Sequence, residues 1–135
     1  MIPGLGAILE TCIYAPDLDA AEAFYGGILG LRRHARAGDR HLFYRCGGQM
    51  LLIFNPAATE RPDPAAPLPV PPHGARGPGH LCLRSNDLDA TRAALTAAGI
   101  RIEAELTWPG GGRSIYVRDP AGNSVEFAEA RIWGL

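Results

Sequence analysis

The feature that most constrains the fold of this chain is an internal repeat. Asp17-Leu18-Asp19-Ala20 recurs as Asp87-Leu88-Asp89-Ala90, an offset of 70 residues, and the same offset relates Cys12 to Cys82. Each copy follows a short apolar stretch and opens a pattern typical of a helix. A repeated supersecondary unit indicates a duplicated module. We therefore expect two copies of one small module that together form a single domain over residues 1–135.

Both copies predict a helix directly after the first strand. An aspartate at the N-cap accepts a hydrogen bond from a backbone N–H of the first turn, and a glycine often ends a helix. These signals predict helices from Asp17 to Gly30 and from Asp87 to Gly99. Gly26-Gly27 weakens the first helix, since each glycine costs roughly 1 kcal/mol relative to alanine. Apolar or small residues recur at helical spacing in both, at Leu18, Ala21, Tyr25 and Ile28, and at Leu88, Thr91, Leu95 and Ala98.

Strand patterns follow each helix. They lie at about 31–37, 40–46 and 49–55 in the first half, and at about 100–106, 113–118 and 123–129 in the second. Each half therefore reads β-α-β-β-β, which predicts an α+β fold built from two βαβββ modules. The modules span about 5–56 and about 79–130. Residues 57–78, rich in proline and glycine, are expected to form an extended linker between them.

The composition indicates which kinds of protein and binding partner to expect. Apolar residues make up 47% and charged residues 20%, and the formal net charge is −1. This balance favours neither nucleic acid nor an anionic membrane as partner, and no apolar run reaches the roughly 18 residues of a membrane span. The segment before residue 7 lacks the basic start of a signal peptide. Three cysteines without CxxC spacing indicate reduced thiols, so we expect a cytoplasmic protein.

Three polar residues interrupt otherwise apolar strands. By strand alternation, Glu10, His80 and Glu126 each lie on the face opposite the residues that pack under the helices. A buried carboxylate is costly unless it is paired. Two carboxylates and one imidazole suit a divalent cation such as Mn²⁺, Fe²⁺, Ni²⁺, Zn²⁺ or Mg²⁺. The alternatives are an ion pair of Glu10 with Arg45 or Arg118 and a purely structural His80.

The candidate metal site leaves coordination positions open. Aligning the two halves places Leu52 where the second half has Glu126, so we expect three protein ligands and room for water or substrate. Glu10 and Glu126 are also the candidate catalytic residues, because a carboxylate that leaves the metal can accept a proton from carbon.

Four other side chains are candidates for substrate binding: His73, Tyr14, Arg118 and Trp108. Each has a structural alternative. His73 can simply pack against the linker, the two aromatic residues can belong to the core, and arginines on strands are often solvated. The glycine-rich stretch that begins at Trp108 lies between two strands rather than before a helix, so we interpret it as a hairpin turn and not as a phosphate loop. A mobile lid is the alternative.

Three segments together resemble the vicinal oxygen chelate superfamily, which includes glyoxalase I, extradiol dioxygenases and bleomycin-resistance proteins. The segments are ETCIYAPDLDAAEAFYGGILGL, GPGHLCLRSNDLDA and YVRDPAGNSVEFAE. The resemblance implies paired βαβββ modules that form an open, U-shaped mixed sheet around a divalent metal. It places Glu10, His80 and Glu126 at ligand positions. Glu10 stands where many members have histidine, and Leu52 stands where glyoxalases have a carboxylate.

The resemblance implies a metal-dependent glyoxalase-like enzyme with isomerase or lyase chemistry on a small substrate chelated through its oxygens. An extradiol, ring-cleaving dioxygenase is an alternative, and so is a binding or resistance protein that catalyses nothing. A small molecule is the expected partner in all three cases. We expect a homodimer, because closed symmetric dimers are the commonest oligomers.

Overall fold

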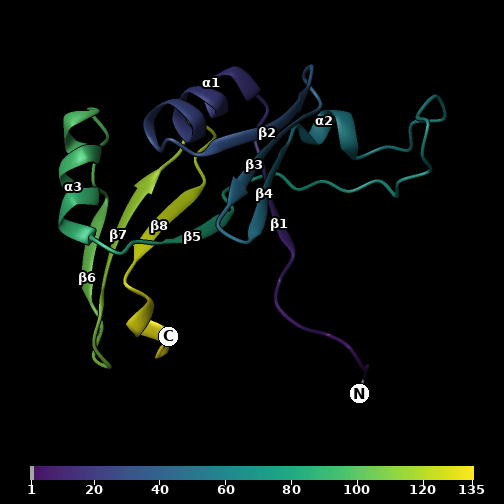
Figure 1. The fold of residues 1–135 in the computed structure, drawn as a ribbon. Helices are drawn as coiled ribbons and strands as arrows, with labels where there is room; N and C mark the ends of the chain where they lie inside the picture. Colours follow the sequence, from purple (N-terminus) through teal and green to yellow (C-terminus); the bar gives the residue numbers. More distant parts are fainter. Residues whose placement is uncertain (1) are drawn as a thin grey trace. The chain divides into compact units, whose positions relative to one another are not determined.

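A computed structural model describes residues 2–135 (Figure 1). The chain divides into two compact units, Met1–Arg76 and Gly77–Leu135, and each is described by itself. No helix among residues 2–135 has both the length and the apolar character needed to cross a membrane.

The first unit contains one four-stranded sheet and the predicted first helix. Its elements are β1 (Glu10–Tyr14), α1 (Leu18–Glu22), η1 (Ala23–Ile28), β2 (Arg32–Ala37), β3 (His41–Cys46), β4 (Gln49–Phe54) and the short helix α2 (Pro56–Thr59). The strand order is β1-β4-β3-β2, with β1 parallel to β4 and the other neighbours antiparallel.

The second unit repeats this plan. Its elements are β5 (His80–Arg84), α3 (Leu88–Ala97), β6 (Ala104–Thr107), β7 (Arg113–Arg118), β8 (Ser124–Ala128) and the short 3₁₀ helix η2 (Ala130–Trp133). The order β5-β8-β7-β6, with β5 parallel to β8, matches the first sheet strand for strand. This confirms an α+β fold with two βαβββ modules.

Each helix packs its apolar side on one face of its own sheet. In the first unit Leu18 and Ala21 of α1 are buried with Leu42 and Ile53 of β3 and β4. In the second unit Leu88 and Leu95 of α3 are buried with core residues of β7 and β8, Ile115, Val117, Val125 and Phe127. Burial of an apolar side chain stabilises by roughly 1.5–3 kcal/mol. The helices therefore occupy one face of each sheet and leave the other face for polar side chains.

Both helix N-caps form as predicted. The carboxylates of Asp17 and Asp87 accept hydrogen bonds of 3.0 and 2.9 Å from the backbone N–H of Ala20 and Ala90. Both glycines that were expected to end the helices adopt a positive φ, 69° at Gly30 and 73° at Gly99.

The first helix differs from the prediction after its first turn. Residues Ala23–Ile28 form a π-helix, in which Leu29 N–H bonds to Phe24 C=O at 2.9 Å. The wider turn changes which side chains face the sheet, so Phe24 is buried and Ile28 is 41% exposed. The Gly26-Gly27 pair lies in this turn. A Cβ on Gly26 would lie 3.1 Å from the hydroxyl of Tyr44, whereas one on Gly27 would meet nothing within 4 Å.

Some boundaries also differ from the sequence expectation. β1 begins at Glu10, and Ile8 and Leu9 before it are strongly exposed. β6 begins at Ala104 rather than at about residue 100. The segment predicted as an extended linker, 57–78, is helical at its start, because residues 57–59 belong to α2. The segment later returns to this helical turn, where His73 N–H bonds to Thr59 C=O at 2.9 Å.

Candidate functional site

The polar face of the second unit brings together His80 and Glu126 from the neighbouring parallel strands β5 and β8. Nε2 of His80 lies 3.3 Å from Oε2 of Glu126. Nδ1 of His80 lies 3.1 Å from the carbonyl oxygen of Ser124. A carbonyl only accepts, so Nδ1 carries a proton, and in neutral imidazole Nε2 then presents a lone pair. Two acceptor atoms thus face each other, an arrangement that is favourable when a cation or a proton lies between them.

The carboxylate of Glu126 is buried, with 5% of the residue exposed. Ser114 Oγ donates a 2.5 Å hydrogen bond to Oε1, and Trp108 Nε1 in turn donates a 2.8 Å bond to Ser114 Oγ. Sequence reasoning missed Ser114. The signal was available, because alternation along β7 places Ser114 on the same face as Tyr116, whose cross-strand partner is Glu126.

Tyr116 and Cys82 flank Glu126 on the two neighbouring strands, each directly opposite it in register. Burial, together with Glu126, raises the pKa of the Cys82 thiol to about 12. Burial and a hydrogen bond to Glu126 also raise the pKa of Tyr116. Both side chains are therefore protonated at neutral pH, and Cys82 lacks the thiolate that a nucleophile needs.

Glu10 lies in the first unit, at the exposed start of β1. The registers confirm its equivalence to His80, because Cys12 pairs with Leu52 as Cys82 pairs with Glu126. Leu52 therefore occupies the position of Glu126, as the alignment of the halves predicted. Among the described residues, 2–135, no group of three histidine, cysteine, aspartate or glutamate side chains lies close enough together to hold a metal.

The first unit brings two predicted substrate-binding residues into contact. Tyr14 Oη and His73 Nδ1 are 2.7 Å apart. The His73 ring also packs edge-on against Phe54 at 4.5 Å, and His41 stacks on Phe43 at 4.1 Å. Tyr14 shares its strand face with Glu10, so this aromatic cluster and Glu10 lie on the same face of β1. Burial lowers the pKa of His41, with a smaller contribution from Arg40.

Arg118 forms an ion pair with Glu103, with Nε 2.7 Å from the carboxylate, and donates a further bond to Gly122 C=O. The hydrogen bond from Arg118 lowers the pKa of Glu103. Arg118 is therefore engaged within its own unit. Its role in substrate binding stays a prediction.

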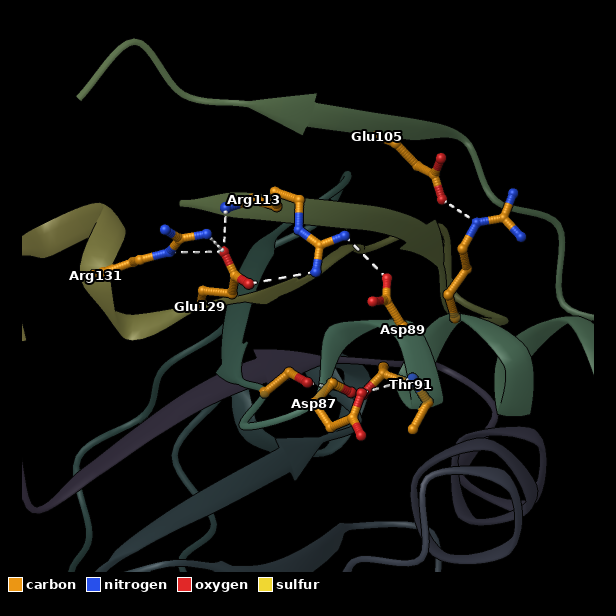
Figure 2. Close-up of polar contacts among 10 residues, drawn as sticks. Asp87, Asp89, Thr91, Glu105, Arg113, Glu129 and Arg131 are labelled. Atoms are coloured by element: carbon orange, nitrogen blue, oxygen red, sulfur yellow. Dashed lines mark hydrogen bonds and ion pairs between the residues drawn. The ribbon is translucent and has the colours of Figure 1, made fainter. Parts of the chain in front are cut away.

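Arg113 belongs to a different network, on the helix side of the sheet (Figure 2). Its guanidinium contacts Asp89 of α3 at 2.9 Å and Glu129 at 3.4 Å, and Arg131 of η2 contacts Glu129 at 2.8 Å. These pairs connect α3, β7 and η2. Because Arg113 and Ser114 are consecutive on β7, they point to opposite faces, and only Ser114 reaches the candidate site.

Trp108 opens the hairpin turn between β6 and β7, as expected from the glycine-rich stretch. Its backbone N–H bonds to Gly112 C=O at 2.9 Å. A Cβ on Gly112 would lie 2.5 Å from Ile132 Cγ2, and Gly112 has a φ of +92°. This turn therefore packs closely on η2, which argues against a mobile lid.

Comparison with known proteins gives a consistent result. The family model of the glyoxalase/bleomycin resistance protein/dioxygenase superfamily matches residues 7–127. The crystal structure of a lactoylglutathione lyase from Agrobacterium tumefaciens is 44% identical, covers 97% of this chain and 98% of its own, and has a TM-score of 0.91.

Two more distant structures share the fold. A glyoxalase family protein from Bacillus anthracis is 22% identical over 96% of this chain and 98% of its own, with a TM-score of 0.72. The virulence protein STM3117 from Salmonella typhimurium is 24% identical over 96% and 98%, with a TM-score of 0.70. No curated protein matches the chain. The match over residues 7–127 and the 44% identical structure show that this chain belongs to the glyoxalase/bleomycin resistance protein/dioxygenase superfamily.

Proposed function

We propose that the protein is a metal-dependent enzyme of the glyoxalase type, with Glu10, His80 and Glu126 as metal ligands. The observation that carries the proposal is the pair of acceptor atoms, His80 Nε2 and Glu126 Oε2, at 3.3 Å. Two adjacent ligand atoms bound to one metal at 2.0–2.1 Å in octahedral geometry lie about 3 Å apart. The hydrogen bond from His80 Nδ1 to a carbonyl is the outer contact that metal-bound histidines usually make.

The charges of this ligand set suit a divalent cation. Two carboxylates and a neutral imidazole carry −2, so M²⁺ gives a neutral centre and offsets the cost of burying Glu126. Mn²⁺, Fe²⁺, Ni²⁺, Zn²⁺ and Mg²⁺ all accept such ligands. When bound, the metal supplies Lewis-acid stabilisation of the negative charge that develops on a substrate oxygen. Leu52 supplies no fourth ligand, which leaves positions for two substrate oxygens.

The residues of the chain supply binding and proton transfer. Glu10 and Glu126 are the carboxylates placed to move a proton at a carbon beside a carbonyl. The similarity to a lactoylglutathione lyase supports an isomerase or lyase reaction and a substrate that carries a thiol-derived group.

Tyr14 and His73 are proposed to contact a part of the substrate far from the metal. Tyr14 lies four residues from Glu10 on β1, which is about 13 Å along a strand at 3.3 Å per residue. That distance is too long for proton transfer at a metal-bound group. Tyr14 and His73 therefore help to determine which substrate binds. Trp108, 37% exposed, and Arg118 are the remaining candidates for substrate contacts.

The proposal is tested by elemental analysis of the purified protein, followed by a substrate screen. We expect about one divalent metal per chain, and isomerisation of a hemithioacetal that continues without oxygen. Oxygen uptake with a catechol would instead support the ring-cleaving dioxygenase. Absence of metal, together with tight binding of an unaltered ligand, would support a binding or resistance protein.

We also propose a cytoplasmic homodimer. Cys12, Cys46 and Cys82 are all unpaired, in keeping with a reducing compartment. Large apolar side chains are exposed near both ends of the chain: Ile2, Leu5, Ile8, Leu9, Trp133 and Leu135. Light scattering coupled to size-exclusion chromatography is expected to give twice the chain mass of 14.4 kDa.

A further inference from the structure

We propose that Trp108 and Ser114 are positioning residues that hold Glu126 in place for the metal. This inference rests on the proposed function. Its physical basis is a chain of two hydrogen bonds, from Trp108 Nε1 to Ser114 Oγ at 2.8 Å and from Ser114 Oγ to Glu126 Oε1 at 2.5 Å.

The chemistry of the side chains determines which atom donates in each of these two hydrogen bonds. The indole nitrogen only donates, so Ser114 Oγ accepts from Trp108. The serine hydroxyl has one proton, which it donates to the carboxylate, and 2.5 Å is the length typical of a bond from a hydroxyl to an ionised carboxylate. Each donor in such a chain polarises the next, which strengthens the bond to Glu126.

The two hydrogen bonds give the two carboxylate oxygens of Glu126 different roles. Oε1 is held by Ser114, and Oε2 faces His80 Nε2 at 3.3 Å. Tyr116 also hydrogen-bonds to Glu126, but without the serine Oε1 loses its buried hydroxyl donor, and the carboxylate is less restrained about its last torsion, which has only a broad preference. The hydroxyl therefore holds Oε1 and leaves Oε2 facing His80, where these two side chains would hold a cation.

Burial makes this support effective. Ser114 is 1% exposed and Glu126 is 5% exposed, so water cannot easily replace the serine hydroxyl. Trp108 belongs to the turn between β6 and β7, which packs on η2. The conformation of that turn is thereby linked to the orientation of a metal ligand on β8.

The first test needs no metal. Trp133 is 78% exposed, so W133F leaves Trp108 as the single indole at little cost. In this background we expect the Trp108 indole proton to exchange slowly with solvent and S114A to speed exchange at least about tenfold and shift its NMR signal. S85A is the matched control, since Ser85 is also buried and bonds instead to Thr91 at 2.8 Å. An indole signal that is unchanged by S114A would overturn the inference.

The second test uses calorimetric titration with Ni²⁺ or Mn²⁺. Loss of an outer contact of a metal ligand typically lowers affinity 10–100-fold, and we expect S114A to fall in this range. W108F should have a smaller effect, and the double variant should bind like S114A alone, because Trp108 acts through Ser114. Losses of affinity that add up in the double variant, or wild-type affinity in S114A, would contradict the proposal that Trp108 acts on Glu126 through Ser114. If the wild type binds neither cation, the proposed metal function fails and this inference fails with it, whereas wild-type binding that S114A leaves unchanged overturns the inference alone.

Discussion

Nε2 of His80 lies 3.3 Å from Oε2 of Glu126, and the other polar atom of each side chain forms a separate hydrogen bond. The Ser124 carbonyl holds the imidazole and the Ser114 hydroxyl holds the carboxylate. A preorganised pair of this kind loses little conformational freedom when it binds a cation. It also gives the proposed site its most direct test.

We expect E126Q and H80A each to lower the affinity for Ni²⁺ or Mn²⁺ by more than about 100-fold, because losing a ligand costs more than losing an outer contact. E10Q should also weaken binding, since it removes the ligand that the first unit contributes. H34A is the control, because His34 is exposed on β2. Isothermal titration calorimetry measures the effect. The site assignment is wrong if E10Q and H80A leave bound metal unchanged.

Y14F and H73Q are expected to raise KM several-fold and to change kcat less than about twofold. Both remove the 2.7 Å contact between Tyr14 Oη and His73 Nδ1, about 13 Å along the strand from Glu10. Loss of this hydrogen bond should cost stability by roughly 1 kcal/mol. Steady-state kinetics measure KM and kcat, and urea unfolding measures the change in the free energy of unfolding. A large loss of kcat at constant KM would instead place the pair in the chemical step.

The free energy of unfolding should fall as the pH drops from 7.5 to 5.5, in part because of His41. Burial among aromatic rings, together with Arg40, lowers the pKa of folded His41 below 6.5. The unfolded chain therefore binds a proton near pH 6.5 that the folded chain resists, and stability is lost below that pH. Because His41 is half-exposed, its share should be less than about 1 kcal/mol.

H41Q tests this expectation in chelator-treated protein, which removes any contribution from bound metal. Urea unfolding at the two pH values should show a smaller loss of stability in H41Q than in the wild type. An equal loss in both proteins would assign the pH dependence to other groups.

Two adjacent glycines in η1 offer a matched pair of substitutions. G26A should destabilise by about 1–3 kcal/mol, because the new methyl group would lie 3.1 Å from the Tyr44 hydroxyl in a packed core. G27A meets nothing within 4 Å and should be neutral or stabilise by up to about 1 kcal/mol. Thermal or urea unfolding measures both, and equal effects would show that close packing at Gly26 does not shape this turn.

The turn between β6 and β7 provides a second pair. G112A should destabilise by about 2 kcal/mol or more, because its methyl group would overlap Ile132 and its φ of +92° suits glycine. G110A has open space around it and should be tolerated. If the turn were instead a mobile lid, both variants would unfold like the wild type and differ from it only in turnover.

Much of the fold follows from local signals in the sequence. The repeated DLDA segments, with aspartate caps and terminal glycines, predict both helices, and alternation predicts which face of each strand is polar. These signals depend only on how residues are spaced along the sequence. They therefore place His80 and Glu126 on one face of the second sheet, and Glu10 at the matching position of the first.

Other features depend on contacts between residues distant in the sequence. The π-helical turn arises where Gly26 meets Tyr44, and the ion pair of Arg118 with Glu103 joins separate segments. The end of the predicted linker packs back on its own unit through Tyr14 and His73. No periodic pattern encodes such contacts, because they depend on how side chains fill space once the sheets have formed.

The sequence by itself determined the duplicated βαβββ architecture and the three candidate ligands, since strand alternation and helix caps act over a few residues. Only the tertiary structure decided that Ser114 and Trp108 support Glu126, and that His80 presents Nε2 to it. The physical reason is that a hydrogen bond requires two atoms within about 3 Å in the right direction, and packing alone brings them there.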